Sequence, residues 1–164
     1  MLIRNFIMVS LLVSGLAHAE QKLPKITMYT PTVCLACVDY ADYLRKNGFT
    51  VQVKPTEDME AVKNRLNVPK DLRAEPSLKV GKYFIEGHVP AEDIKEFLAE
   101  KPKARGLTVP GLPLGAPGRE YSNPTCDTAC TVLDSSTGQG RVRRELYNTY
   151  LVKPDGGTKV YSRH

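Results

Sequence analysis

The sequence predicts an α/β fold whose elements follow the order βαβαββα, with a β-hairpin added near the C-terminus. Two observations predict this order. Between residues 26 and 98, two kinds of segment follow one another along the chain. In the strand-like segments apolar and polar residues alternate, and in the helix-like segments apolar residues recur at three- and four-residue steps. Gly81-Lys82 then separates two short apolar segments, as the turn of a hairpin does. A strand–helix–strand unit implies a right-handed crossover, and the hairpin implies an antiparallel edge.

The first strand, at 26–29, leads through Pro31 into a helix that starts with Cys34-Leu-Ala-Cys37. We expect Cys34 to precede the helix and Cys37 to lie one turn inside it. Gly48 should end the helix, because glycine adopts the left-handed cap at little steric cost. The face expected to be buried continues from the two cysteines through Val38, Ala41 and Leu44.

The remaining core elements follow from the same patterns. Residues 49–53 alternate as a half-buried strand, and Thr56 is the expected N-cap of the next helix. Pro76 opens the first strand of the hairpin, where a proline costs no ladder hydrogen bond. Pro90 lies in the first turn of the last core helix. The apolar residues expected inside the two helices are Met59, Val62 and Leu66, and Ile94, Phe97 and Leu98.

Residues 1–19 have the features of a secretory signal peptide. Arg4 precedes an uncharged, largely apolar stretch, and Ala17-His18-Ala19 matches a cleavage site. We therefore expect cleavage after Ala19, export to a bacterial periplasm, and no attachment to the membrane afterwards. The rest should form one domain, with a core at 20–105 and an extension at 106–164.

The extension begins with a segment, 106–118, that contains four glycines and three prolines. This is too many for a helix or a central strand, so we expect a rigid covering loop, with a direct ligand role as the alternative. Cys126 and Cys130 follow in a polar, turn-rich stretch. Residues 146–152 and 159–161 are expected to pair as the C-terminal hairpin.

Composition argues against two classes of site. The formal net charge is +5 and the basic residues are spread along the chain, so a nucleic-acid-binding surface is not expected. After signal cleavage only His88 and His164 would remain as imidazoles, which excludes a metal site built from many histidines. The four cysteines fall into two close pairs, for which three disulfide connectivities are possible.

Cys34 and Cys37 are the candidate reactive residues. The unpaired N–H groups and the positive dipole end of a helix favour a thiolate at its N-terminus. A thiolate is both a nucleophile toward disulfides and a ligand for soft metals. Cu(I) accepts two sulfur ligands, so this pair alone suffices to bind it. A permanently closed structural disulfide is the alternative interpretation.

Three other residues are candidate metal ligands. His88 follows a glycine at the end of a strand, where its ring either packs, caps the next helix or reaches a metal. Zinc is possible only if Cys126 and Cys130, or His88, complete its ligand set with the first cysteine pair. As alternatives, Cys126 and Cys130 form a local disulfide, or a second dithiol that passes electrons or copper to the first pair.

The order of elements, the Cys-x-x-Cys sequence at the first helix and Pro76 before the third strand together resemble the thioredoxin fold in its small, glutaredoxin-like form. The resemblance implies a cis peptide bond before Pro76, which would pack against Cys34 and Cys37. It also implies thiol–disulfide exchange, in which these three residues would be catalytic.

Four longer motifs occur together in this sequence: Pro31-Thr-x-Cys34-x-x-Cys37, Asn47-Gly48-Phe49, Ile85-Glu86-Gly87-His88-Val89-Pro90 and the Gly/Pro-rich segment 106–118. Together they resemble one family of exported metal-binding proteins, the one that includes the copper-resistance protein CopG. Its implied function is Cu(I) binding through sulfur on a thioredoxin-like fold. This sequence has Leu35 and Ala36 between the cysteines, where the family usually has a third cysteine, and it lacks the family's Cys-His pair before the hairpin.

We therefore predict an exported protein of copper handling or resistance that binds Cu(I) through Cys34 and Cys37 and uses no organic cofactor. A periplasmic thiol protein or a copper carrier is the expected partner. One alternative function is thiol–disulfide oxidoreductase activity at the same pair. The other is a non-catalytic interaction module whose binding surface is formed by the loops at 106–140.

Overall fold

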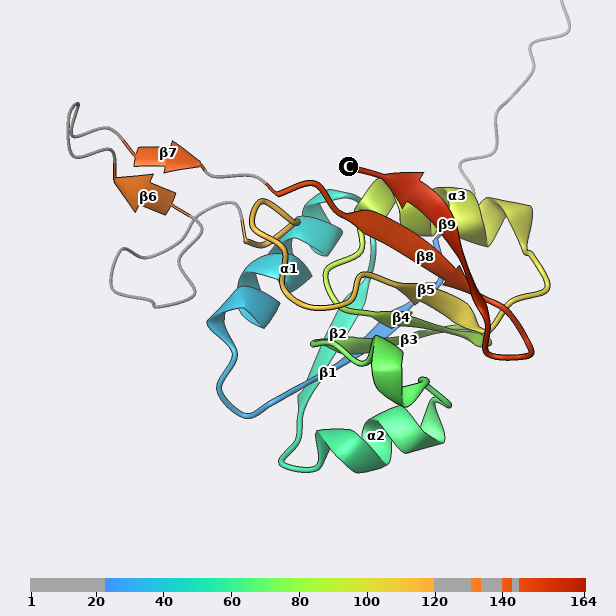
Figure 1. Ribbon diagram of the computed structural model, residues 1–164. Coiled ribbons are helices and arrows are strands. Elements are labelled where there is room, and N and C mark those ends of the chain that lie inside the picture. The colour runs from blue at the N-terminus through green and yellow to red at the C-terminus, as the bar shows by residue number, and fades with distance from the viewer. Residues whose placement is uncertain (1–22, 120–130, 134–139, 143–144) are drawn as a thin grey trace, which may run out of the picture.

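The computed structural model describes residues 23–119, 131–133, 140–142 and 145–164 (Figure 1). The expected signal peptide, Cys126 and Cys130 lie outside these residues. The helices are α1 (Leu35–Lys46), α2 (Met59–Arg65), α3 (Ala91–Glu100) and a 3-10 turn at Lys70–Leu72. The strands are β1 (Ile26–Thr30), β2 (Val51–Pro55), β3 (Ser77–Val80), β4 (Tyr83–Glu86), β5 (Gly106–Thr108), β6 (Thr131–Leu133), β7 (Gly140–Val142), β8 (Asn148–Val152) and β9 (Thr158–Arg163).

The described residues form a mixed α/β fold. Seven strands make one sheet in the order β2-β1-β3-β4-β5-β8-β9, and β6 pairs with β7 in a second, two-stranded sheet. The predicted order βαβαββα is confirmed between β1 and α3. β1 pairs with β2 in parallel across the α1 crossover, whereas β3 is antiparallel to β1 and forms the expected hairpin with β4.

The prediction for residues 106–118 is wrong at its first three residues. β5 lies inside the sheet, parallel to β4 and antiparallel to β8. Four residues precede the first proline of the segment, and the first three of them pair with a neighbour on each side. The β3–β4 hairpin is consequently not an edge of the sheet. The C-terminal hairpin β8–β9 forms as predicted and joins the main sheet through β5.

Helices cover both faces of the sheet, with α1 and α3 on one side and α2 on the other (Figure 1). Successive residues of a strand point to opposite faces. Ile85 accordingly packs in the main apolar cluster with α1 and α3, while its neighbour Phe84 packs with Val68, Leu72 and Val152 in a second cluster. Among the described residues, no helix has the length and apolar character needed to cross a membrane.

Two local predictions about the helices are wrong. Val38 is 57% exposed, and Tyr40 takes its place on the buried face of α1 beside Ala41 and Leu44. Tyr40 follows the buried Cys37 by three residues and therefore shares its face, whereas Val38 is turned about 100° away from it. The N-cap of α2 is Asp58, whose carboxylate accepts a hydrogen bond from the backbone N–H of Ala61, and not Thr56.

Candidate functional site

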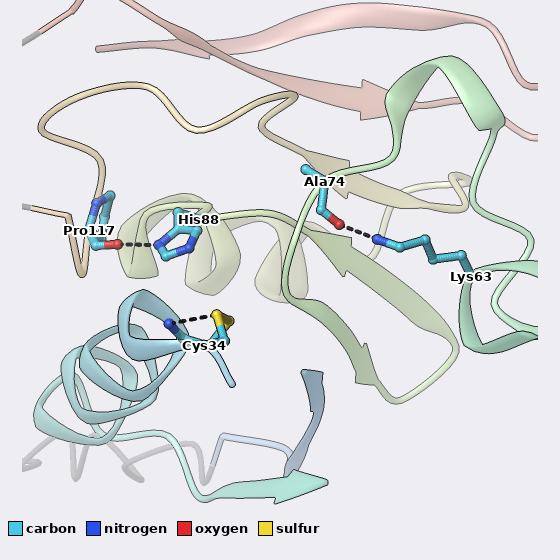
Figure 2. The surroundings of a disulfide bond; sticks show 6 residues. Cys34, Lys63, Ala74, His88 and Pro117 are labelled. Atoms are coloured by element: carbon cyan, nitrogen blue, oxygen red, sulfur yellow. Dashed lines mark hydrogen bonds between the residues drawn. A yellow bond between two sulfur atoms is a disulfide. The ribbon is translucent and has the colours of Figure 1, made fainter. Parts of the chain in front are cut away.

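Cys34 and Cys37 form a disulfide at the N-terminus of α1, with their Cα atoms 5.3 Å apart (Figure 2). Cys34 is the N-cap residue, as predicted, and its Sγ accepts a hydrogen bond of 3.2 Å from the backbone N–H of Cys37. An N-cap side chain satisfies one of the four N–H groups that have no partner within the helix. The Cys34 sulfur therefore lies where the helix backbone stabilises negative charge.

The two sulfurs differ in their access to solvent. Cys37 is only 2% exposed, whereas Cys34 is half-buried. Three apolar side chains around the pair point to solvent, Val33 at 85%, Leu35 at 75% and Val38 at 57% exposed. An incoming molecule therefore meets Cys34 first, next to these three exposed apolar side chains.

His88 lies beside the motif, between the loop that carries Pro117 and the first turns of α1 (Figure 2). Its ring is 1% exposed and lies 4.7 Å from the ring of Tyr40, measured between centroids. Nδ1 is 2.7 Å from the carbonyl oxygen of Pro117. Because a carbonyl only accepts hydrogen bonds, Nδ1 carries the proton and Nε2 keeps a lone pair.

The Nε2 atom of His88 is buried and has no hydrogen-bond partner among the residues that the structure describes. Burial is the main cause that lowers the pKa of this imidazole to about 4, and the positive charge of Arg119 adds to it. The hydrogen bond to Pro117 opposes the shift. His88 is therefore a neutral base at pH 7. Its ring is packed in the interior, which is one of the three roles expected from the sequence, and its Nε2 lone pair is available to a ligand.

The segment after β5 packs onto α1 and His88, in agreement with a covering loop. Gly118 has φ +77°, and a Cβ built at this residue would lie 2.6 Å from the backbone nitrogen of Tyr40. Its neighbour Pro117 supplies the carbonyl that holds His88. Only glycine permits this close contact between the loop and the helix.

Pro76 lies at the same end of the sheet as the two cysteines. β1 ends just before the motif, and its Tyr29 pairs with Ser77, the residue after Pro76. The Glu75–Pro76 peptide bond is cis, as the resemblance implies. The carbonyl of Pro76 accepts a hydrogen bond of 2.8 Å from the backbone N–H of Gly87, the residue before His88.

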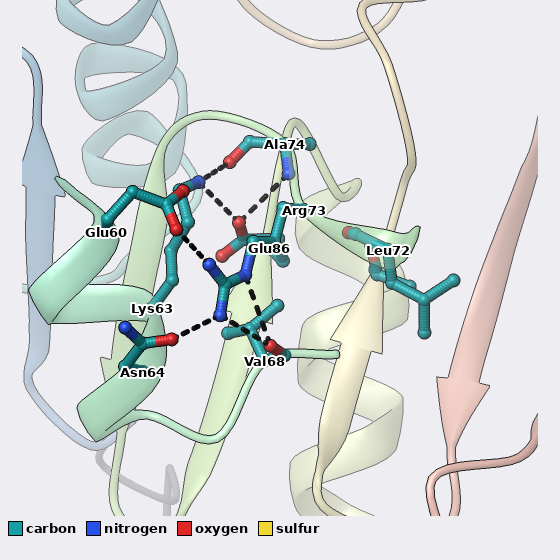
Figure 3. Close-up of polar contacts among 9 residues, drawn as sticks. Glu60, Lys63, Asn64, Val68, Leu72, Arg73, Ala74 and Glu86 are labelled. Atoms are coloured by element: carbon teal, nitrogen blue, oxygen red, sulfur yellow. Dashed lines mark hydrogen bonds and ion pairs between the residues drawn. The ribbon is translucent and has the colours of Figure 1, made fainter. Parts of the chain in front are cut away.

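A buried ion pair that the sequence analysis missed holds the segment before Pro76 (Figure 3). Lys63 Nζ lies 2.7 Å from Glu86 Oε1, and the two side chains are 4% and 0% exposed. Lys63 also donates to the carbonyl of Ala74, while the N–H of Ala74 donates to Glu86 Oε1 at 2.9 Å. Burial raises the pKa of Glu86, and Lys63 opposes this rise. The sequence signal was a glutamate in the otherwise apolar segment Tyr83–Glu86.

Arg73 fixes the same segment from its exposed side (Figure 3). Its guanidinium forms an ion pair with Glu60, donates to Asn64 Oδ1 at 2.5 Å and reaches the carbonyl of Val68 at 3.4 Å. Together with the Lys63–Glu86 pair, these contacts tie α2 to the backbone immediately before Glu75 and Pro76. The position of that backbone beside the motif therefore depends on side chains from α2 and β4.

Two solved structures, titled "Copper resistance protein copG" Form 1 and Form 2, are similar to this chain. They are 30% and 29% identical to it, and in both cases the match covers 87% of this chain and 98% of the other, with a TM-score of 0.70. The chain belongs to the CopG family. A family model described as "Protein of unknown function, DUF411" also matches residues 77–119. No curated protein matches the chain.

Membership of the CopG family confirms the resemblance read from the sequence motifs. The DUF411 match at 77–119 contains His88, β5 and the covering loop, but it begins after the cysteine pair. The position of the two cysteines at the N-terminus of α1 therefore comes from the structure and not from this match.

The set of possible metal ligands around the motif is small. Among the described residues, no cluster of three or more His, Cys, Asp or Glu side chains is arranged to hold a metal ion. The motif offers the two sulfurs of Cys34 and Cys37, with the free nitrogen of His88 nearby. This set fits a soft ion of low coordination number, whereas zinc in a structural site takes four ligands. Cys126 and Cys130, the other predicted ligands, lie outside the described residues.

Proposed function

We propose that this protein handles copper and that one Cu(I) ion binds between the sulfurs of Cys34 and Cys37 in their reduced state. The observation that carries the proposal is the pair of adjacent sulfurs at the N-terminus of α1, in a chain similar to copper resistance proteins over most of its length. Cu(I) prefers soft thiolate ligands. The helix N-terminus stabilises the negative charge that the Cu(I)–dithiolate unit carries.

We further propose a thioredoxin-like fold and an exported, periplasmic protein. The fold proposal is supported by the order β2-β1-β3-β4, by the crossover helix that starts at the motif, and by Pro76 at the neighbouring strand end. Export is supported by the signal-peptide features of residues 1–19. The disulfide between Cys34 and Cys37 agrees with this location, because disulfides persist in oxidising compartments.

Loading the site requires a reductant, for which we propose a dithiol protein. The Cys34–Cys37 disulfide accepts two electrons and two protons, the dithiol is oxidised to a disulfide, and two thiols form in this protein. Binding of Cu(I) then releases two protons as both sulfurs become thiolates. Because Cys34 is the accessible sulfur, the reductant attacks it first and Cys37 leaves as the thiolate.

His88 is the candidate third ligand in this proposal. Its ring is neutral at pH 7, and its Nε2 lone pair has no hydrogen-bond partner in the described part of the chain. The carbonyl of Pro117 holds the other ring nitrogen, which is the kind of outer contact that orients a ligating histidine. His88→Ala should weaken Cu(I) binding only if Nε2 reaches the ion, whereas loss of both sulfurs should abolish it.

An anaerobic titration with Cu(I) against a strong chromogenic chelator tests the proposal. The reduced wild-type chain should bind one equivalent more than the Cys34→Ser/Cys37→Ser variant, because a hydroxyl is a poor Cu(I) ligand. Val33→Ser is the matched control, since it adds a hydroxyl beside the motif and removes no sulfur. The Cys126→Ser/Cys130→Ser variant should still bind one equivalent of Cu(I) tightly. Equal binding by wild type and the Cys34/Cys37 variant would end the metal proposal at this site.

A second candidate function is thiol–disulfide exchange, and the closed disulfide with one accessible sulfur favours it. In the reduced protein the Cys34 thiolate would attack a substrate disulfide, and one substrate sulfur would leave as a thiolate. Cys37 would then attack Cys34 Sγ in the mixed disulfide and release the second substrate sulfur.

Turnover distinguishes this second candidate from a copper carrier. With a dithiol donor in excess, an exchange enzyme should reduce many equivalents of a disulfide-bonded test protein. Cys34→Ser should abolish the activity, whereas Cys37→Ser should accumulate the mixed disulfide, which non-reducing electrophoresis detects. Reduction of a single equivalent, with no further turnover, would remove the enzyme function.

A further inference from the structure

A pocket lies at the end of the sheet opposite to the cysteine motif. The motif follows the C-terminal end of β1, whereas Val80 pairs with Ile26 at the other end of that strand. The pocket has a volume of about 340 Å³ and is bounded by the chain just before β1, the β3–β4 turn and the C-terminal half of α3. This volume is at the small end of the range for ligand pockets, about 300–1,000 Å³.

The floor of the pocket is apolar and fixed by the core. Val80 and Tyr83 are buried members of the main apolar cluster, and Leu23 and Leu98 pack against that cluster. The Tyr83 hydroxyl donates a hydrogen bond of 2.9 Å to the carbonyl of Pro102, which holds the phenol ring in place. The floor therefore presents a preformed apolar surface.

The rim of the pocket is positively charged. Lys82, Lys95 and Lys101 line it, and no aspartate or glutamate occurs among the described residues that do. The ammonium of Lys82 lies 5.0 Å from the centroid of the Tyr83 ring, which places a cation directly over an apolar wall. Lys82, Ala99 and Lys101 are exposed at the mouth, so the pocket opens to solvent.

We propose that this pocket binds the carboxylate form of a single-chain fatty acid of medium length. The apolar floor would take the alkyl chain, and the lysines at the rim would pair with the carboxylate. An anion without a chain would leave the floor exposed to water, and a chain without a charge would leave the lysines unpaired. A pocket of this volume accommodates one chain, which favours a fatty acid over a two-chain membrane lipid.

This pocket is separate from the proposed Cu(I) site, because it lies at the other end of the sheet and no cysteine or methionine among the described residues lines it. Occupation of the pocket therefore does not depend on whether Cys34 and Cys37 bind a metal. It would give the molecule a second ligand of a different chemical class.

Titration of the full chain with decanoate below its micelle concentration, followed by isothermal calorimetry and backbone NMR, tests the proposal. We expect saturable binding at one site, with shifted amide signals at Lys82, Tyr83 and Ala99. Acetate has the charge without the chain, and decanoyl-N-methylglucamide has the chain without the charge, so both should bind at least tenfold more weakly. Because exposed charge pairs are screened, decanoate affinity should fall as salt is added.

Variants assign the binding to the pocket. Ala99→Phe fills the mouth from an exposed helix position and should abolish binding while the protein stays folded. Lys82→Gln/Lys95→Gln should weaken binding roughly two- to thirtyfold, in line with about 0.2–1 kcal/mol for each of the two charge pairs that the variant removes. Lys159→Gln, an exposed lysine on β9, is the matched control and should bind as wild type does.

Three outcomes would overturn the proposal. Equal affinity for acetate and decanoate would mean that the lysines bind anions without the pocket. Unchanged binding by Ala99→Phe would place the decanoate elsewhere. Binding to anionic phospholipid vesicles without binding to monomeric decanoate would make this face a membrane contact instead of a fatty-acid site.

Discussion

At the scale of single residues, the surroundings of each side chain decide its chemistry. Cys34 and Cys37 are three positions apart, yet one sulfur caps a helix at the surface and the other is buried. His88 is neutral because it is buried, and its tautomer follows from one carbonyl, that of Pro117. The two sulfurs therefore differ in exposure, and a neutral imidazole belongs to the same small region.

The buried His88 should make the free energy of unfolding depend on pH. Its pKa is about 4 in the folded chain and about 6.5 when unfolded, so between these values the unfolded chain binds more protons. The stability that the neutral imidazole contributes is fully present above pH 6.5. As the pH falls from 6.5 toward 4 it is lost, and the free energy of unfolding drops by up to about 1.4 kcal/mol per pH unit.

Urea denaturation at several pH values between 4 and 7 measures this effect. His88→Gln removes the titrating group, so the free energy of unfolding of that variant should vary less steeply with pH than that of wild type. Parallel pH profiles for the two proteins would mean that His88 is accessible to protons in the folded state.

At the scale of elements, the site depends on how a loop, a helix and a strand end are held together. The segment after β5 lies on α1 through Gly118, and the same segment supplies the carbonyl that fixes His88. On the other side, Lys63 from α2 and Glu86 from β4 hold the backbone at Ala74. These contacts fix the backbone on both sides of the cysteine motif.

Gly118→Ala should destabilise the fold more than Gly111→Ala does. The two residues have similar conformations, with φ +77° and φ +73°, so both substitutions carry a similar backbone cost. Only the Cβ at Gly118 meets the backbone of Tyr40, at 2.6 Å, whereas the one at Gly111 has nothing within 4 Å. We expect a difference of about 1–3 kcal/mol between the two variants.

Thermal or urea denaturation of the two glycine variants gives this difference directly, because Gly111→Ala is the control for backbone strain. Gly118→Ala should also shift the NMR signals of the His88 ring, which the same loop holds. Equal stabilities would show that the loop moves away from α1 at no cost, and the covering role would then be wrong.

At the scale of the whole molecule, neither of the two apolar clusters includes Cys34 or Cys37. The main apolar cluster joins α1, α3 and the central strands, and a second cluster lies on the other face of the sheet. The two cysteines are only three positions apart in the sequence, so the disulfide closes a very short loop. Because the stabilisation by a disulfide grows with the length of the loop it closes, this one constrains the unfolded chain little.

The Cys34→Ser/Cys37→Ser variant should therefore stay folded and lose about 2 kcal/mol or less of the free energy of unfolding. Urea denaturation of the oxidised wild type and of the variant measures the loss, and circular dichroism checks that the fold is kept. A loss of 5 kcal/mol or more would mean that the pair is a structural staple, the alternative considered from the sequence. It would also weaken both proposals that need the reduced state.

Sequence patterns were sufficient to predict the features that depend on neighbours along the chain. The order of elements, Cys34 at the start of α1 and the turn at Gly81-Lys82 follow from residue spacing, turn residues and helix-start preferences. These are short-range effects, which sequence patterns record directly. The motifs at 85–90 and 106–118 also indicated the family, which the similarity to the CopG structures confirms.

The tertiary structure decided what depends on partners distant in the sequence. It placed β5 inside the sheet, because β4 and the distant β8 both pair with it. It turned α1 so that Tyr40 is buried and Val38 is exposed, because the rotation of a helix is set by the sheet beneath it. It also paired Lys63 with Glu86 and left one nitrogen of His88 free. The energy of a buried charge or of an unpaired nitrogen depends on which atoms surround it, and only the folded chain defines those atoms.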